Sequence, residues 1–569
     1  MNKNTLFPSP IETRIWGLIF LLIPFIALVL ASCTFAMGGV IATWMFPSAV
    51  AVALATGHLC IKAMASKPHA IWRFYIYSIA LLALSLLSSA ILYDNSYDGN
   101  TYHQGSIIDM LQGVNPFHNP TEFFLIWSKH YAKSLEIVAA TISICFNRIE
   151  CGKAVNLLLI LASIFTTYAF LRKEFEHHTV GKSLFLTLLL ALCPVVVRQS
   201  YIYYNDFALY TLPLMATIAL IEIFRRDDKL SWYILIATTL IAATTKFTIA
   251  FYLYLIIAIA IAWYFLAGKR SLCYKTTYIA VALLIVGLCM LGYHPYITNI
   301  QLGGNPFYPL VGGNVDIMSS NTPTLFVDGN RLANWLRSLF YNAQGTGVWI
   351  PFVNDSLYDY YIAYDSRIAG FGPLFGYTLI ASIILFAIAQ HQERRTQKHN
   401  KTRANTFTLL AIILLAACFI FEQSWWARYI PFLWAIPIML TIYTEYNQNL
   451  SRALRILRNA IYAALCATIL LCCAATIIGG MSYTQRLGAI YNSITPQSSV
   501  EVYSGTLFKS INYKLQERNI QFTILHENQP SDSTLLPIEV INQSVIYLDE
   551  KTYSRIKRPD MIDFMQKHK

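Results

Sequence analysis

Residues Ile91–Pro120, ILYDNSYDGNTYHQGSIIDMLQGVNPFHNP, lie where a long apolar segment meets acidic and aromatic residues. Asp94 and Asp98 lie at or just past the end of the predicted helix, and Tyr102 and His103 follow within about two helical turns. A carboxylate at this boundary can act as a general base on a molecule whose tail lies in lipid and whose head lies outside. The alternative is that these acids are solvated residues that simply end a helix.

The composition is that of a polytopic membrane protein. The chain has 569 residues, of which 56% are hydrophobic and only 13% are charged, whereas soluble domains carry about 25% charged residues. Apolar segments of roughly 17 to 25 residues recur along most of the length, and each is long enough to cross a bilayer core of about 30 Å. The sequence therefore predicts an all-α membrane fold.

Hydropathy predicts about thirteen membrane helices. Two of them fall within residues 1–73, and the others lie within 74–480. The predicted spans are 15–36, 38–60, 74–93, 154–171, 183–199, 207–225, 231–246, 247–267, 276–293, 371–390, 406–422, 429–445 and 459–480.

The distribution of positive charge predicts the topology. With the N-terminus in the cytoplasm, the inner segments hold 22 of the 42 Lys and Arg residues, and the outer segments before residue 481 hold 10. This bias in short loops is the positive-inside rule, and it places the long loops 94–153 and 294–370 and the C-terminus outside. The net charge of +12 is thereby explained without nucleic acid.

The first outer loop contains two segments of mixed polarity, at 101–113 and 121–149. We expect both to be amphipathic helices that lie in the interface with one apolar and one polar face. Residues 134–149 could instead form a membrane hairpin arm, although a single added crossing would invert every later loop.

Residues 481–569 lose hydrophobicity and gain charge. Val500–Tyr503, Ile520–Ile524 and Val545–Leu548 are β-rich runs separated by polar helical stretches, which predicts a small α/β domain. A domain of this size forms only a modest core, so we expect it to lean on the membrane part as a lid or docking module.

The eleven cysteines lie mostly inside apolar spans, and their spacing is typical of neither a disulfide framework nor a metal site. Cys145 and Cys151 fall in the same outer loop, so a disulfide between them is one alternative.

Charged and polar residues collect at the outer ends of several other spans. Asp206 closes the short loop Tyr201–Asp206 before the sixth span, and Lys246 lies at the outer junction of the seventh and eighth. Arg428 and Tyr429 open the twelfth span. Ionisable groups near a bilayer are costly and are commonly functional or paired.

Each of these residues also has a structural interpretation. Lys246 could be a turn residue, Arg428 could snorkel to the headgroups, and Asp206 could cap a helix. His103 and His294 could be hydrogen-bonded structural histidines. The common depth of these acids and bases at the outer face favours an anionic lipid-linked substrate with a base beside it.

Four short motifs resemble, in order and on the expected face, those of bacterial GT-C-type membrane glycosyltransferases. They are Asp98-Gly-Asn-Thr-Tyr-His103, Thr245-Lys-Phe-Thr248, Gly292-Tyr-His-Pro-Tyr-Ile-Thr-Asn299 followed by Gly304-Asn-Pro-Phe-Tyr-Pro309, and Arg428-Tyr-Ile-Pro431. These enzymes belong with the protein O-mannosyltransferases and the lipid A aminoarabinose transferase. The resemblance covers about residues 74 to 445.

The resemblance implies transfer of a sugar from a polyprenyl-phosphate donor to a lipid, glycan or protein acceptor, with inversion at the anomeric carbon. Asp98 would be the general base, and Lys246 and Arg428 would hold the departing lipid phosphate. No nucleotide would be needed. The other residues that would bind donor or acceptor are Tyr102, His103, Asp206, His294, Asn299, Asn305 and Tyr429.

The chain departs from the Asp-Glu pair of better-known members, because it has Asp98-Gly99 with Asp94 one helical turn earlier. Asp94 is therefore an alternative catalytic acid, although the spacing to Tyr102 favours Asp98. A divalent metal near both acids is a further candidate, for which the sequence contains no full ligand set.

The resemblance also implies a multi-pass protein of the bacterial inner membrane, with a cytoplasmic N-terminus and a periplasmic C-terminal domain. Two other classes stay open. A polysaccharide polymerase or ligase would use similar lipid-linked sugars, whereas a transporter should carry charges near the midplane and repeat-related broken helices.

Overall fold

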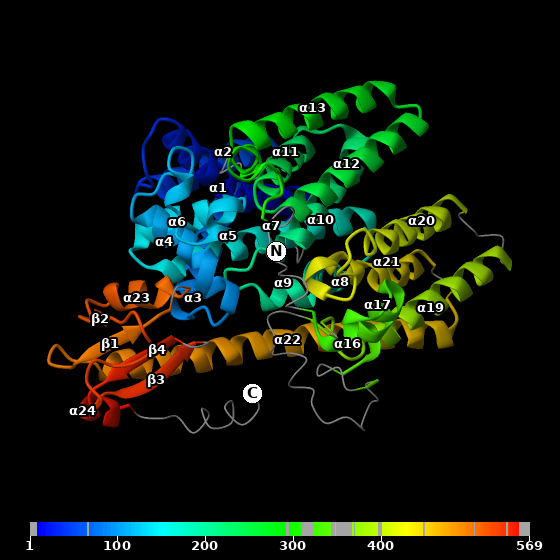
Figure 1. The fold of residues 1–569 in the computed structure, drawn as a ribbon. Coiled ribbons are helices and arrows are strands. Elements are labelled where there is room, and N and C mark those ends of the chain that lie inside the picture. Colours follow the sequence, from blue (N-terminus) through cyan, green and yellow to red (C-terminus); the bar gives the residue numbers. More distant parts are fainter. Residues whose placement is uncertain are drawn as a thin grey trace.

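The computed structural model of the chain describes residues 8–64, 68–291, 295–309, 322–342, 347–348, 367–368, 370–395, 401–447, 450–505, 507–541 and 544–556. Most of these residues are helical, and a small sheet lies near the C-terminus. Figure 1 shows the helices as a bundle, with the sheet and the short helices α4 to α6 at the same end of it.

Nine helices in the described ranges are long and apolar enough to cross a membrane. They coincide with nine of the thirteen predicted spans. They are α1 (Pro10–Ala36), α2 (Met45–Met64), α3 (Pro68–Ile91), α7 (Ala154–Glu174), α10 (Ala208–Arg226), α12 (Phe247–Leu266), α13 (Arg270–Cys289), α19 (Phe375–Arg395) and α22 (Arg452–Ser493).

The other four predicted spans contain shorter helices. Two of them, α11 (Lys229–Ala243) and α20 (Lys401–Ala417), are continuous helices of 15 and 17 residues. The prediction of one continuous helix over 183–199 is wrong, because α8 (Val180–Ala191) stops before Pro194 and the short α9 (Pro194–Arg198) follows. Proline lacks the N–H that a helix interior requires.

The segment 429–445 is also broken. The short 3₁₀ turns η5 (Ala427–Tyr429) and η6 (Pro431–Trp434) precede the nine-residue helix α21 (Ala435–Tyr443). Pro431 starts the second turn, so regular α-helix begins only at Ala435, after Arg428 and Tyr429.

Helix α1 lies inside the bundle and packs against α2, α7 and α11, and its middle residues are almost all buried. The outer helices instead leave large apolar side chains uncovered, among them Leu84, Leu266, Tyr278 and Leu470. A soluble protein rarely exposes so much contiguous apolar surface, whereas a lipid-facing helix must.

The short helices between residues 94 and 153 differ from the amphipathic helices that we expected there. In α4 (Gln104–Leu111), residues 104 to 110 are all buried, and in α6 (Ser134–Phe146), residues 134 to 143 are all buried. Their polar side chains bond within the protein, as Ser134 Oγ does with Thr245 Oγ1 at 2.6 Å. The expected polar face toward water is therefore wrong.

The C-terminal sheet has the strand order β2-β1-β4-β3. The strands are β1 (Val500–Tyr503), β2 (Thr523–Ile524), β3 (Leu536–Ile541) and β4 (Ser544–Leu548). Strand β2 pairs parallel with β1, whereas β4 pairs antiparallel with both β1 and β3. The sequence predicted β1 and β4 closely, overestimated β2 and missed β3.

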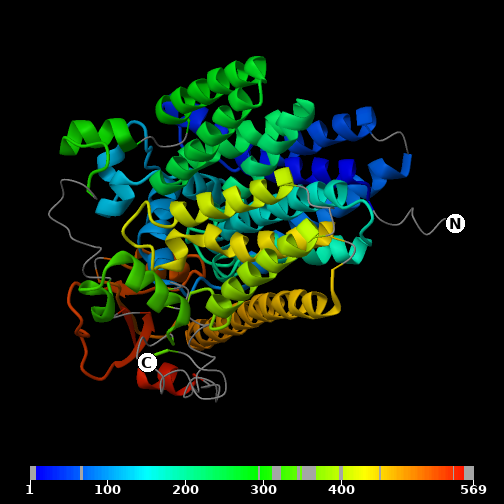
Figure 2. The same cartoon turned by 90° about the vertical axis from the view of Figure 1, so that its right-hand side faces the viewer.

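Helix α22 has 42 residues and continues to Ser493, beyond the predicted domain start at 481. Figures 1 and 2 both show it along one side of the bundle, with the sheet at its far end. Leu487 and Tyr491 of α22 share a core with Tyr93, Val502 and Ile546. The C-terminal region thus packs on the membrane part.

All eleven cysteines are free thiols, including Cys145 and Cys151. The alternative of a disulfide between these two residues is therefore wrong for this structure.

Candidate functional site

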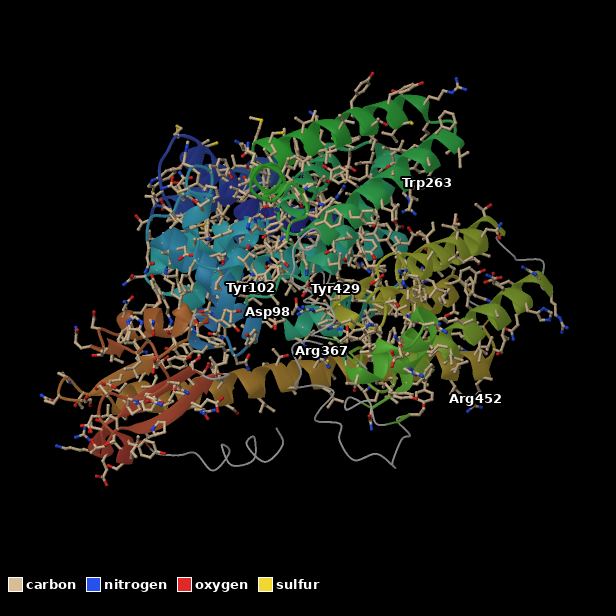
Figure 3. The ribbon with its side chains drawn as sticks, in the orientation of Figure 1. Asp98, Tyr102, Trp263, Arg367, Tyr429 and Arg452 are labelled. Atoms are coloured by element: carbon tan, nitrogen blue, oxygen red, sulfur yellow. The ribbon has the colours of Figure 1, made fainter. Side chains whose placement is uncertain are left out.

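Asp98 lies on a connection between the end of α3 and α4. Residues 93–96 have no regular structure, and Tyr97 and Asp98 then lead into η2 (Gly99–His103), a single π-helical turn that continues into α4. Single π turns inside α-helical segments are frequent at functional sites. Figure 3 shows Asp98, Tyr102 and Tyr429 close together near the middle of the molecule, with Trp263 and Arg452 toward the other end.

Asp98 forms an ion pair with Arg428. The Oδ2 atom of Asp98 lies 3.3 Å from Nη1 of Arg428, and 22% of the Asp98 side chain is exposed. Arg428 belongs to η5, which ends just before the 3₁₀ turn that begins at Pro431. The two residues come from opposite halves of the sequence.

A second carboxylate, Asp206, contacts the same arginine. Its Oδ2 lies 3.8 Å from Nε of Arg428, and its Oδ1 lies 2.5 Å from Nζ of Lys246. Lys246 immediately precedes α12, and Asp206 lies just before α10. The cluster Asp98–Arg428–Asp206–Lys246, hereafter the charged cluster, joins four segments that are remote in sequence.

The charged cluster holds its buried members in their charged forms. Burial alone would raise the pKa of Asp206, but the charges of Lys246 and Arg428 lower it below its usual value. Burial alone would lower the pKa of Lys246, but the charge of Asp206 raises it above its usual value. These groups are therefore ionised at neutral pH.

Aromatic side chains surround the charged cluster. The guanidinium carbon of Arg428 lies 4.5 Å from the ring centroid of Trp426, 5.5 Å from that of Tyr204 and 5.2 Å from that of Tyr429. Lys246 Nζ lies 5.1 Å from the Tyr429 centroid. Aromatic faces attract cations and keep water away from them, so the cluster has a partly dry setting.

Two tyrosines lie on the Asp98 side of the charged cluster. The rings of Tyr102 and Tyr131 meet edge to face at 6.1 Å. Burial raises the pKa of both phenols, and the negative charge of Asp98 raises it further. Both hydroxyls are therefore protonated, and they can donate hydrogen bonds to a sugar or phosphate oxygen.

His103 points to a different partner. Its Nδ1 lies 2.6 Å from Oε1 of Glu136, and this oxygen also accepts a hydrogen bond from Nδ2 of Asn205 at 3.0 Å. Burial alone would raise the pKa of Glu136, but His103 lowers it. His103 therefore links η2 to α6 and to the loop that carries Asp206.

Asp94 is completely buried and separate from the charged cluster. Its Oδ1 accepts hydrogen bonds from N and Oγ of Ser96, at 2.8 and 2.6 Å, and its Oδ2 accepts one from N of Tyr203 at 2.8 Å. A Cβ atom on Gly99 would clash with the Asp94 carboxylate and Ser96 Oγ. The packing of Asp94 thus explains why glycine follows Asp98.

Asn299 and Asn305 hold the segment around α14 (Pro295–Gly303). Asn299 Oδ1 lies 2.7 Å from His130 Nδ1, and its Nδ2 donates to the carbonyls of Pro306 and Tyr308. Asn305 Oδ1 accepts from the backbone N–H of Phe307 at 2.8 Å. The hydrogen bonds of both asparagines are structural. Asn299 also holds α5 (Ile126–His130), the helix before Tyr131, through its bond to His130. His294 lies outside the described residues.

The structure brings together Asp98, Tyr102, Asp206, Lys246, Arg428 and Tyr429 of the predicted site residues. Four residues around the charged cluster were not predicted from the sequence: Tyr131, Tyr204, Trp426 and Glu136. The density of tyrosine in Tyr201–Asp206 and the tryptophan pair before Arg428 were the available signals for two of them.

The residues at Asp94 and Asp98 do not fit a divalent metal. Both Asp94 oxygens already accept hydrogen bonds from protein groups, and Asp98 is paired with a guanidinium. In the part of the chain that the structure describes, no group of three or more His, Cys, Asp or Glu side chains is arranged to hold a metal ion.

No protein-family model matches the chain, and no curated protein matches it in sequence.

Proposed function

We propose that the protein is a membrane glycosyltransferase that moves a sugar from a polyprenyl-phosphate donor to an envelope acceptor at the outer face of the membrane. The observation that carries this proposal is the charged cluster, in which Arg428 reaches both Asp98 and Asp206 while Lys246 pairs with Asp206. It combines a partly exposed carboxylate with two cations, the set that proton removal and phosphate departure require.

The reaction is a single displacement at the anomeric carbon. The acceptor oxygen or nitrogen attacks this carbon as its proton passes to Asp98, and the bond from the carbon to the phosphate oxygen breaks. The bonding pair leaves with the polyprenyl phosphate, and the configuration inverts. A positioned base typically contributes about 10² to 10⁴ in rate.

The two cations stabilise the phosphate as it departs. Arg428 offers a planar fork that matches two phosphate oxygens, and Lys246 offers a compact point charge. Before the donor binds, Asp98 and Asp206 occupy these cations. A donor phosphate competes with Asp98 for Arg428, so donor binding frees the carboxylate to accept a proton.

The architecture that we propose is GT-C-like, with thirteen crossings in a bacterial inner membrane. The N-terminus lies in the cytoplasm and the C-terminal sheet in the periplasm. The charge bias of the loops supports this orientation. The turn between α12 and α13 and the ends of α19 and α20 all point away from the sheet, toward the same end of the bundle (Figure 1). These ends carry Lys269, Arg270, Arg394 and Arg395.

There are two alternative functions, of which one uses the same catalytic base and cations. A polysaccharide polymerase or ligase would need the same base and phosphate-binding cations, and it differs only in the size of the transferred group. A transporter is less well supported, because the charged cluster lies in loops at helix ends and not in the middle of the candidate spans.

The test is the Asp98→Asn variant of the full chain. We expect it to fold like the wild type and to lose transfer by about 10²-fold or more. The measurement is mass spectrometry of lipid-linked sugars and envelope glycans from cells that carry wild type, variant or no protein. Asp532→Asn, on the exposed surface of the C-terminal domain, is the matched control. Transfer at the wild-type rate in Asp98→Asn would exclude Asp98 as the base.

A further inference from the structure

Helix α23 (Lys509–Gln516) of the C-terminal region packs directly against η2 and α4. In Figure 1 it lies between the sheet and the short outer-loop helices. Ser510 Oγ donates to the backbone carbonyl of Asn100 at 2.7 Å, and Lys514 Nζ donates to Asn100 Oδ1 at 2.8 Å. The C-terminal region thus holds the π turn two residues after Asp98.

Asn100 transmits this contact to the segment that carries Asp98. Its Nδ2 donates to the backbone carbonyls of Asp94 and Ser96, both at 2.8 Å. The side chain is almost completely buried. These bonds close a loop of backbone from residue 94 to residue 100, and Asp98 lies inside this loop.

Lys514 also joins a buried set of charges behind this loop. Its Nζ lies 3.0 Å from Oε1 of Glu150, and Glu150 also pairs with Lys153. The N–H of Asp94 donates to Glu150 Oε2 at 3.0 Å. Lys514, Glu150 and Lys153 are at most 2% exposed. Separating α23 from the membrane part would break the Lys514–Glu150 ion pair and the Lys514–Asn100 hydrogen bond, and it would leave Glu150 with Lys153 alone.

We infer that α23 is a fixed part of the reaction centre, and that Lys514 positions the Asp98 turn through Asn100. This inference rests on the proposed function of Asp98. Of the two roles expected from the sequence, a lid or a docking module, it favours the docking module, because a lid would have to break the buried contacts of Lys514 in each cycle. Lys514 touches neither reacting group, so it is a positioning residue.

The test compares two lysines of the same helix in the full chain. Lys514→Met removes the contact with Asn100, and Glu150 keeps its partner Lys153. Lys509→Met is the matched control, because Lys509 pairs with Asp109 of α4 at 2.6 Å. Ser510→Ala is a milder second variant that also loses a bond to Asn100.

The first readout is amide hydrogen exchange over residues 97–103. We expect faster exchange there in Lys514→Met and Ser510→Ala, and wild-type exchange in Lys509→Met. Unchanged exchange in Lys514→Met and Ser510→Ala, or an equal increase in Lys509→Met, would overturn the inference. This readout does not depend on transferase activity.

The second readout is the kinetics of transfer. We expect Lys514→Met to lower kcat by about tenfold to 10²-fold, since small misplacements of a reacting group have effects of this size, and to leave the donor KM nearly unchanged. A raised KM with unchanged kcat would contradict a positioning role. If the wild type transfers no sugar, the proposed function fails, while the exchange experiment still decides whether Lys514 holds the turn.

Discussion

Nη1 of Arg428 lies 3.3 Å from Oδ2 of Asp98, across 330 residues of sequence. This contact joins the 3₁₀ turn before α21 to the π turn before α4. Attraction within an ion pair of partly buried groups offsets the cost of desolvation only when the geometry of the pair is good. Here Pro431 restricts the backbone that follows Arg428, and the hydrogen bonds of Asn100 hold the backbone around Asp98. The carboxylate and the guanidinium therefore meet in a defined geometry.

Arg428→Ala should weaken donor binding more than any other single change in the charged cluster. Hydrogen bonds to charged groups contribute about 1.5–3 kcal/mol, so we expect donor affinity to fall by roughly ten- to 10²-fold. Arg428→Lys should recover part of this loss, since it restores the charge without the fork. The measurement is titration with polyprenyl phosphate. Arg452→Ala, at the other end of the molecule (Figure 3), should bind like the wild type; equal weakening in both variants would refute a specific role.

Gly99→Ala should disturb the Asp98 turn, whereas Gly105→Ala should not. A Cβ on Gly99 clashes with Asp94 and Ser96, whereas one on Gly105 meets nothing closer than 3.9 Å. Overpacking at Gly99 should cost about 1–3 kcal/mol of stability, and alanine at Gly105 should be neutral or stabilising by up to about 1 kcal/mol. Thermal unfolding of the full chain measures both. Equal stability of the two variants would show that Asp94 does not constrain this position.

Tyr131→Phe should lower transfer without changing the fold. Burial raises the pKa of this phenol, and the charges of Asp98 and Arg428 also act on it. Loss of one hydrogen bond corresponds to about 1 kcal/mol, or roughly fivefold in kcat/KM. Tyr278→Phe, on the exposed face of α13, is the control. An unchanged kcat/KM in Tyr131→Phe would remove this hydroxyl from the site.

The pH dependence of stability should report on Glu517. Burial raises the pKa of this carboxyl to about 7, from an ordinary value of 4.5. The folded state therefore holds the proton more tightly than the unfolded state, so its stability falls as the pH rises from about 4.5 to about 7 and stays low above that range.

Glu517→Gln removes this titration while keeping an acceptor for the N–H of Ile149, which now donates to Oε1 at 2.5 Å. The variant should melt higher than the wild type at about pH 8 and like the wild type near about pH 4.5. Glu527→Gln, at an exposed position, should leave the profile unchanged. A wild-type profile in Glu517→Gln would contradict the assignment.

The sequence predicted the members of the charged cluster better than it predicted the structure around them. Charged residues are few in so apolar a chain. Their position at the ends of the predicted spans placed Asp98, Asp206, Lys246 and Arg428 at a common depth in the membrane. Hydropathy also located the long helices. Both signals are local along the chain, and the structure agrees with them.

The contacts that the sequence missed are those made across long separations. Glu136 lies in a segment that the sequence assigns to an interface, and only the packing of α4 against α6 shows that it is buried. Tyr131 lies between α5 and α6 and is half-buried. The contact of Lys514 with Asn100 spans 414 residues, and no local pattern encodes such a pairing. Pro194 was a signal for the break between α8 and α9. The break lies inside an apolar segment, so it does not lower the hydropathy of that segment, and hydropathy alone predicted one continuous helix.

The length of α22 has a mechanical consequence. A helix of 42 residues extends about 63 Å, about twice the thickness of the hydrocarbon core. Because the final turns of this helix are rigid, they fix the distance of the sheet from the bundle and its orientation. Inserting a few residues near Gly479 would lift and rotate everything beyond that point, and so would draw Lys514 away from Asn100 without altering either residue.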